Sequence, residues 1–533
     1  MKTISPDINK QSVSAVKWSA LGSIAQYGLS LGAQIVLARM LGPENYGLFA
    51  MGTIVLTFSN FFSNFGFAWG LIQIQDLIEE DIRFVFTWQL IAGVIIAIGL
   101  YLLSPFVADY FNEPRVAPIV RWLSLACVFS AITAPASNLL RRNLDFRWIN
   151  IIQIISYSIG YLVIGIPMAY QGAGVWSLVA AWLTQSFIML VMTFIRHPHS
   201  IKPLFWYSGA KVISGVGITV FVTNLCNWLL NNMDRIFLGR FLDSHAVGLY
   251  TVGYNLSNTP NSLFVGAFQP AFLTAGARLQ SEPDRLRRAY LPVIATVWIL
   301  IAPLFVLFAM IAQNLIGFLY GSAWASSAMV LAILALSMPA YITWSMSTPI
   351  LWNTGRKHLE SLLQLPILAI AGYAFYSFAN QGIVMVALIA AGILFIRAVV
   401  ITTAACRQLS ISALDLFPFA VRGIVMMSLT AASTFSGIKL GVLASIYTDT
   451  KLSLLAHTFV GIKINFIAVT TYLFPLFGGV FMGSLILLAS VFIFPRLLGN
   501  EVIGMLGRFS PRLSRALGDK VKADSRKLVA VKK

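Results

Sequence analysis

Charged residues are scarce in this chain of 533 residues, because Asp, Glu, Lys and Arg together make up only 11% of it. A soluble protein needs roughly 25% charged residues to cover its surface, so a soluble multidomain protein is excluded. Hydrophobic residues make up 58% of the chain and its mean hydropathy is +0.81. They come in blocks of about twenty, the length that crosses a bilayer as a helix. The composition therefore predicts an all-α polytopic membrane protein.

Cysteine and catalytic motifs are also scarce. Cys127, Cys226 and Cys406 are widely spaced, with no CxxC or Cys/His cluster, which argues against a disulfide framework and a zinc site. The chain has no DxD pair, no His/Asp cluster and no glycine-rich phosphate loop. We therefore expect no enzyme activity, no catalytic residues, no metal site and no cofactor. An ion gradient or the membrane potential remains open as an energy source.

Acidic residues are half as frequent as basic ones, which gives a net charge of +18. In a soluble chain this excess would suggest nucleic acid, but in a membrane protein it reports orientation. Alternate loops are basic, as around Arg141 and Arg285, whereas loops 170–174, 312–324 and 380–382 have no Lys or Arg. The pattern predicts that both termini are cytoplasmic and that the basic tail rests against anionic lipid, without nucleic acid.

About fourteen apolar segments can be counted as membrane spans. They lie near 18–41, 46–72, 84–104, 117–140, 148–169, 174–195, 212–242, 246–276, 289–311, 325–351, 361–379, 383–405, 417–442 and 467–495. The predicted parts are a cytoplasmic tail (1–17), an N-lobe (18–196), an inter-lobe loop (197–211), a C-lobe (212–406), two further spans with a long periplasmic connection (407–498) and a basic tail (499–533). Segment 451–466 is interrupted by charge and could lie on the membrane as an interfacial helix.

An internal repeat relates the first twelve spans. Leu37-Ala38-Arg39-Met40-Leu41 with Gly47 recurs, shifted by 201 residues, as Leu238-Gly239-Arg240-Phe241-Leu242 with Gly248. Tyr170-Gln171-Gly172 recurs as Asn380-Gln381-Gly382, shifted by 210. Since six spans are an even number, the two six-helix copies enter the membrane from the same side and are parallel repeats. Such duplicated bundles are typical of transporters.

The repeated residues also carry a resemblance to a known family. The sequence ALGSIAQYGLSLGAQIVLARMLGPENYGLFAMG at 20–52 resembles the opening of Wzx-type polysaccharide flippases. FGFAWGLIQ at 65–73, GAGVWSLVAAWL at 172–183 and NNMDRIFLGRFLDSHAVGLYTVGYNL at 231–256 add to it. The likeness is greatest to the colanic-acid-exporter branch of a superfamily that includes multidrug extruders and lipid II flippases. The stretch 444–466 departs from the family pattern.

The resemblance implies a flippase in a bacterial inner membrane, with two lobes that work by alternating access. Its substrate would be an isoprenoid-pyrophosphate-linked oligosaccharide, moved to the periplasmic leaflet for exopolysaccharide, capsule or O-antigen synthesis. Its partners would be membrane lipids and the polysaccharide polymerase and export machinery. Two alternatives stay open: a multidrug or cation extruder, and a membrane polysaccharide polymerase or glycosyltransferase.

Polar residues follow one helical face in four predicted spans, namely the first, second, seventh and eighth. The other spans have fewer polar residues. Ser23, Gln26, Ser30 and Gln34 share a face of the first span, because they are three or four residues apart. A shift of 201 residues places Asn224, Asn227, Asn231 and Arg235 in the seventh span. These stripes indicate either a wall of the substrate path or hydrogen bonding between helices.

We take the polar faces and three arginines as the candidate substrate-binding set. Its members are Gln26, Ser30, Gln34, Arg39, Asn60, Asn64, Asn224, Asn227, Asn231, Arg235, Arg240, Asn258 and Asn261. Amides and hydroxyls match sugar hydroxyls, and Arg235 is the best-placed residue for a pyrophosphate. Arg39 and Arg240 could instead snorkel to headgroups.

Asp234 is the one carboxylate that we place inside the membrane, and it is a candidate for ion coupling. It could equally be the partner of Arg235 or Arg240. Arg397 and Arg422 lie toward the cytoplasmic ends of their spans, where we expect their side chains to snorkel to the interface.

Overall fold

The computed structural model describes residues 6–63, 71, 77–207, 218–280, 282–455, 460–493, 497–499, 501–503 and 505. Within this part the chain is nearly all helical. Ten of the helical segments are long and apolar enough to cross a membrane. The prediction of a polytopic helical membrane protein is therefore confirmed, and the count of fourteen spans stays a prediction.

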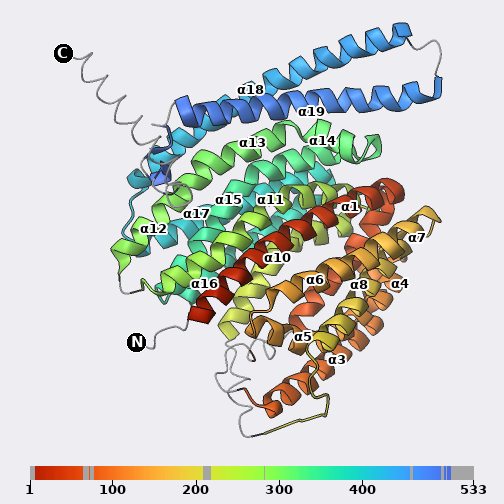
Figure 1. The fold of residues 1–533 in the computed structure, drawn as a ribbon, viewed down its shortest axis with the longest axis vertical. Coiled ribbons are helices and arrows are strands. Elements are labelled where there is room, and N and C mark those ends of the chain that lie inside the picture. The colour runs from red at the N-terminus through yellow and green to blue at the C-terminus, as the bar shows by residue number, and fades with distance from the viewer. Residues whose placement is uncertain are drawn as a thin grey trace. The chain divides into compact units, whose positions relative to one another are not determined.

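The first part of the described chain contains ten helical elements (Figure 1). They are α1 (Pro6–Ser63), α3 (Glu79–Phe111), α4 (Val116–Leu123), α5 (Leu125–Arg142), α6 (Phe146–Tyr157), the π-helix η1 (Ser158–Gly165), α7 (Ile166–Tyr170), α8 (Val175–Arg196), α10 (Ile218–Phe241) and α11 (Ser244–Ala277). Several of these follow one another without a loop, as do α6, η1 and α7, so that one apolar segment is covered by more than one element.

The remaining elements run to the end of the described chain. They are α12 (Pro283–Thr296), the π-helix η2 (Val297–Ile301), α13 (Ala302–Met310), α14 (Ala312–Leu319), η3 (Ser322–Trp324), α15 (Ser327–Asn353), α16 (Lys357–Phe378), η4 (Ala379–Gln381), α17 (Ile383–Gln408), α18 (Ala413–Leu455) and α19 (Val460–Ile493). The basic tail from residue 506 onward lies outside the described residues. Residues 208–217, which include the end of the predicted inter-lobe loop and the start of the predicted C-lobe, also lie outside them.

Glycines mark the breaks that the sequence predicts between spans. Gly42 has φ 73°, a left-handed value that few side chains tolerate, and with Pro43 it divides α1 into two helices. The break falls between the predicted spans 18–41 and 46–72. Gly172 and Gly382, which the repeat makes equivalent, also have positive φ. Each lies in the short turn before a long apolar helix, α8 or α17, and allows the chain to reverse there.

The chain forms two compact units. The first unit comprises Met1–Thr251 and Phe375–Ile383, and the second comprises Val252–Ala374 and Val384–Lys533. Each unit is described by itself below. The predicted lobe boundaries near residues 196 and 212 stay a prediction.

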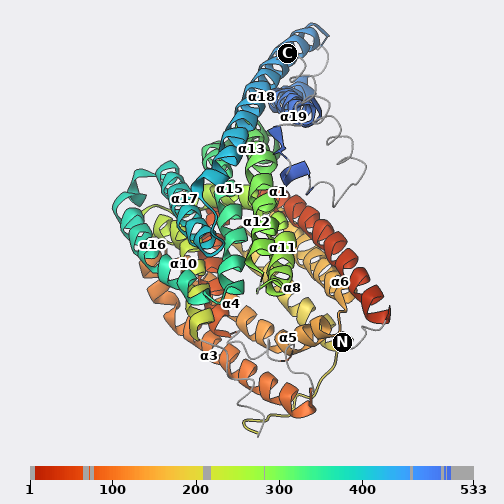
Figure 2. The ribbon, with the colours of Figure 1, turned by 90° about the vertical axis from the view of Figure 1, so that its left-hand side faces the viewer.

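The two last long helices of the second unit lie side by side (Figures 1 and 2). A Cβ atom on Gly437 would overlap Gly478 O, and one on Gly441 would overlap Phe474 O, so α18 and α19 meet through glycine backbones. We predicted that the thirteenth span ends at residue 442, but α18 continues to Leu455. Between Gly441 and Leu455 the chain has no glycine or proline that would break the helix. Much of the expected connection is therefore helix, and residues 456–459 lie outside the described chain.

Candidate functional site

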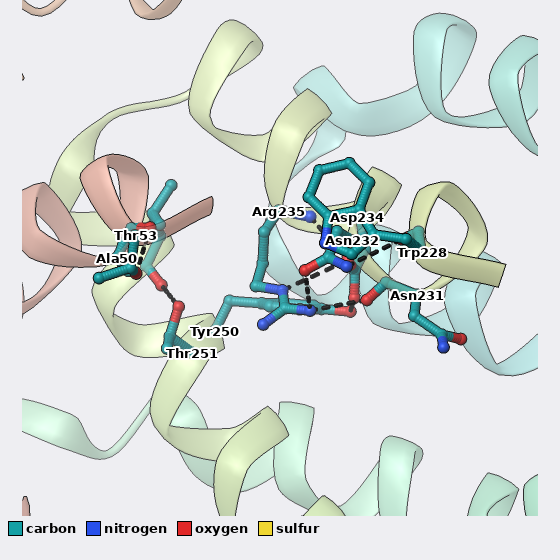
Figure 3. Close-up of polar contacts among 10 residues, drawn as sticks. Ala50, Thr53, Trp228, Asn231, Asn232, Asp234, Arg235, Tyr250 and Thr251 are labelled. Carbon is teal, nitrogen blue, oxygen red and sulfur yellow. Dashed lines mark hydrogen bonds and ion pairs between the residues drawn. The ribbon is translucent and has the colours of Figure 1, made fainter. Parts of the chain in front are cut away.

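Arg235 lies on α10 in a cluster of polar groups from its own helix (Figure 3). Its Nη2 donates hydrogen bonds to Asn231 O at 2.6 Å and Asn232 Oδ1 at 3.0 Å, and its Nε lies 3.5 Å from Asp234 Oδ1. The Arg235 and Asp234 side chains are only 12% and 7% exposed. A guanidinium has five N–H donors in a planar fork, so these contacts fix the orientation of the Arg235 side chain.

The Asp234 carboxylate joins α10 to α11. Its Oδ2 accepts a 2.7 Å hydrogen bond from the Tyr250 hydroxyl, and its Oδ1 accepts one from the Arg235 backbone N–H at 2.8 Å. Tyr250 is fully buried. A buried carboxylate is tolerated only when it is paired and hydrogen-bonded, and both conditions hold here. The sequence analysis missed Tyr250. The repeat offered a signal, because Tyr250 carries a hydroxyl group where the equivalent residue of the first copy, Phe49, has none.

Two equivalent glycines of the repeat meet at the start of α11. A Cβ atom on Gly47 would overlap Ser244 O, and one on Gly248 would overlap Pro43 O. Residues 43 and 244 are themselves equivalent under the shift of 201, so the contact is reciprocal. Only glycine lets two backbones approach this closely. The repeated Gly-Leu motif is thus explained by a direct contact between its two copies.

We expect Gly248→Ala to destabilise the folded protein by about 1–3 kcal/mol, because the methyl group overpacks a backbone contact. The measurement is thermal unfolding of the purified full chain. Gly32→Ala is the matched control, since a Cβ atom on Gly32 of α1 has no atom within 4 Å. That control should be neutral or slightly stabilising, as alanine is the better helix former. Equal unfolding temperatures for the two variants would contradict the proposed contact.

Arg240, a second candidate, holds the C-terminal end of α3. Its Nη1 donates to Asp109 O at 3.2 Å, Tyr110 O at 2.8 Å and Asn112 Oδ1 at 3.2 Å. Its guanidinium also lies 5.6 Å from the centre of the Tyr110 ring. The last carbonyls of a helix lack partners within the helix and carry partial negative charge, so Arg240 acts as a cap. Its equivalent, Arg39, is exposed on α1.

The other candidates are placed as follows. Gln26, Ser30 and Gln34 on α1 and Asn227 and Asn231 on α10 are half-buried, and Asn224 is exposed. In the second unit, the Nδ2 of buried Asn261 donates a 2.9 Å hydrogen bond to Asn258 Oδ1. The side chains of Ser23 and Asn60, and the whole of Asn64, lie outside the part that the structure describes.

An apolar groove of about 390 Å³ lies beside the Arg235 cluster in the first unit. It is lined by α1, α3 and α10, and Phe58 and Trp228 are in ring contact within it, with centroids 4.9 Å apart. Trp228 also accepts, through its carbonyl, a hydrogen bond from Asn232. One stretch of α10 therefore contributes to a polar cluster and an apolar groove. This combination suits a ligand with a charged head and a hydrocarbon chain.

The second unit contains a buried polar network that the sequence analysis missed. Glu360 on α16 is 1% exposed and accepts hydrogen bonds from Trp352 Nε1 at 2.6 Å and Gln364 Nε2 at 3.1 Å. The Gln364 Oε1 accepts from Arg397 Nη2 at 3.4 Å, and the Arg397 guanidinium lies 3.8 Å from the centre of the Trp344 ring. The network joins α15, α16 and α17.

One prediction is corrected by this network. Arg397 does not snorkel, because its side chain is fully buried, and the aromatic face and the amide replace water around its charge. Glu360 is a second buried carboxylate, and it lies in the first turn of a helix that is itself a candidate span. The available signal was the spacing of Glu360 and Gln364, which places both on one helical face.

Comparisons with known proteins agree with this architecture. A family model described as polysaccharide biosynthesis protein matches residues 36–329. The chain is similar to the lipopolysaccharide biosynthesis protein WzxC of Escherichia coli strain K12, with 23% identity over 339 residues, 62% of this chain and 67% of that protein. It is also similar to the succinoglycan biosynthesis transport protein ExoT of Rhizobium meliloti strain 1021, with 24% identity over 354 residues, covering 66% and 72%.

Among solved structures, the chain is similar to the lipid II flippase MurJ in an inward closed conformation. The TM-score is 0.67 at 14% identity, and the match covers 90% of this chain and 98% of that one. At this identity the similarity shows a shared fold. The matched family region contains the Arg235 cluster and the Gly47–Gly248 contact.

Proposed function

Since the chain belongs to the polysaccharide biosynthesis protein family, we propose that it flips an isoprenoid-pyrophosphate-linked oligosaccharide across a membrane by alternating access. The observation that carries this proposal is the family match itself, which extends over both copies of the repeated motif. The fold shared with MurJ, a lipid II flippase, supports it. The oligosaccharide would serve the synthesis of a surface polysaccharide.

The proposed topology has fourteen crossings, with two parallel six-helix repeats and two further helices. Both termini would be cytoplasmic, in a bacterial inner membrane, as the loop charges indicate. The equivalent positive-φ turns at Gly172 and Gly382 and the reciprocal contact of Gly47 and Gly248 support the repeat.

The proposed substrate site uses the Arg235 cluster for the pyrophosphate and the amide-rich faces of α1 and α10 for the sugars. Amides donate and accept hydrogen bonds at once, which suits sugar hydroxyls. The apolar groove beside α10 has the chemistry for the isoprenoid chain. We propose no cofactor and an ion gradient or membrane potential as the energy source, with Asp234 as a coupling candidate. Membrane lipids and the polymerase and export machinery would be its partners.

The proposal predicts where the lipid-linked saccharide accumulates when the gene is deleted. Lipid-linked repeat units should build up in the cytoplasmic leaflet, which can be measured by their accessibility to an enzyme added to inside-out or right-side-out vesicles. Arrival in the periplasmic leaflet at the usual rate would refute the flippase proposal. As a control for the enzyme alternative, the purified chain is tested for sugar transfer from a lipid-linked donor, and turnover there would also refute it.

A further inference from the structure

A partly open cavity of about 350 Å³ with a mixed polar and apolar lining lies in the first unit, and its lining contains no residue of the Arg235 cluster. It is lined by the second half of α1, by α5 and by α8, and none of its described lining residues belongs to the candidate set taken from the sequence. Ligand pockets in proteins range from about 300 to 1,000 Å³. The cavity is at the small end of this range, which corresponds to one or two sugar rings rather than a whole repeat unit.

One face of α5 supplies most of the polar lining. Ser130, Thr133, Ser137 and Arg141 follow one another at three- or four-residue steps, which places them on one helical face. This is the same spacing as in the first span, in a helix that the sequence analysis took as plain. A polar stripe inside an apolar protein indicates contact with water or a ligand.

Two hydroxyl groups that line the cavity can accept hydrogen bonds from a ligand bound in it. Thr133 Oγ1 donates to Phe129 O at 2.7 Å, and Ser186 Oγ on α8 donates to Trp182 O at 2.9 Å. A hydroxyl has one proton and two lone pairs. Because each hydroxyl donates its proton within its own helix, its lone pairs remain to accept hydrogen bonds from O–H groups of a ligand. A sugar ring offers several O–H groups.

The cavity is positive at one end and aromatic at one wall. Arg141, in the last turn of α5, is the cation of the lining, and no lining residue that the structure describes is acidic. The Trp182 ring is held edge-on by Phe49, with centroids 6.0 Å apart, and an indole face can cover the apolar face of a sugar ring.

We propose that this cavity binds a phosphorylated sugar, with the phosphate at Arg141 and the ring against Trp182 and the hydroxyls of α5 and α8. Arginine recognises phosphate through paired N–H donors, and the absence of a carboxylate in the described lining favours an anion over a cation. The choice of a sugar phosphate rests on the proposed function. The ligand is either the head of the lipid-linked saccharide or a free sugar phosphate, which share this chemistry.

The test is protection of an introduced cysteine from a maleimide reagent in the full chain. Ser137→Cys places a thiol in the cavity wall, and the three native cysteines are buried, so the background is low. Two probes are added separately: α-D-glucose 1-phosphate, and glucose linked to farnesyl diphosphate. Protection by either supports the inference, and protection by the second alone identifies the lipid-linked saccharide as the source. Labelling that neither probe slows overturns the inference.

Two further variants make the result specific. Loss of a charged hydrogen-bonding partner weakens binding about tenfold or more, so Arg141→Ala in the Ser137→Cys background should remove the protection at the same probe concentration. Ser158→Cys, half-buried on η1 outside the cavity, should show no protection with either probe. If Ser137→Cys does not fold, Ser186→Cys on the opposite wall takes its place.

The outcome is separable from that of the proposed function. The same variants are reconstituted into proteoliposomes, and flipping of a fluorescent lipid-linked saccharide is measured there. Flipping by the protein without protection at Ser137→Cys overturns the cavity inference and leaves the flippase proposal intact. Protection without flipping supports the cavity inference and overturns the flippase proposal, because the cavity then binds a sugar phosphate in a protein that does not transport the lipid-linked saccharide.

Discussion

Arg235→Ala is expected to abolish polymer export per folded molecule in the membrane. The Arg235 guanidinium is the charge that we assign to the pyrophosphate, and its contacts to Asn231 and Asn232 hold it in one orientation. An oriented guanidinium binds phosphate oxygens through paired donors, and losing one charged partner costs about 1.5–3 kcal/mol. Export is measured as the amount of surface polymer in a deletion strain complemented with each variant.

Two variants separate the charge of Arg235 from its packing. Arg235→Gln introduces the residue that the repeat has at the equivalent position, Gln34, and keeps a polar side chain without the charge. It should fail as Arg235→Ala does. Asn232→Ala removes one acceptor for the guanidinium and leaves the charge, so export should fall only partly. Normal export by Arg235→Gln would show that no charge is needed there and would remove Arg235 from the pyrophosphate site.

Stability must be measured beside export, because Asp234 depends on the same cluster. Removing Arg235 leaves the carboxylate with the Tyr250 hydroxyl and a backbone N–H. Removing one partner of a buried ion pair can cost about 3–5 kcal/mol, although Arg235 retains some exposure. The full-length protein must therefore be quantified in the membrane, and export is compared per folded molecule.

Local features of the fold were predictable from the sequence because they depend on backbone chemistry. The break between the first two spans follows from Gly42-Pro43, which cannot continue a regular helix. The repeated Gly-Leu motif pointed to equivalent positions, and the structure adds that the two glycines touch. The ion pair between Asp234 and Arg235, which are neighbours on one helix, was also among the possibilities that the sequence indicated.

Contacts between helices were not predictable, because periodicity shows which residues share a face but not what that face meets. Arg397 illustrates this limit. Near the end of an apolar span an arginine ordinarily reaches the interface, and only the positions of Trp344 and Gln364 show that this one has a buried partner set. The stripe on α5 was missed for a different reason: it mixes small hydroxyl residues with alanines, so its polarity is weak until the cavity is seen.

Arg397→Ala is expected to destabilise the second unit by about 3–5 kcal/mol, the range for breaking a buried charge network from one side. The change removes the cation over Trp344 and the donor to Gln364, and it leaves the Glu360 carboxylate buried. A loss of this size corresponds to a fall of roughly 10 °C in the unfolding temperature. The measurement is thermal unfolding of the purified full chain in detergent.

Arg407→Ala is the matched control, because Arg407 lies in the last turn of the same helix and is exposed. Exposed charges contribute about 0–1 kcal/mol, so this variant should unfold near the native temperature. The coupling between Glu360 and Arg397 is tested by a double-mutant cycle with Glu360→Gln. If the two charges stabilise each other through Gln364, the double variant loses less stability than the sum of the single ones. Additive losses would mean that Arg397 contributes by packing against Trp344 alone, and that Glu360 is an independent buried carboxylate available for another role.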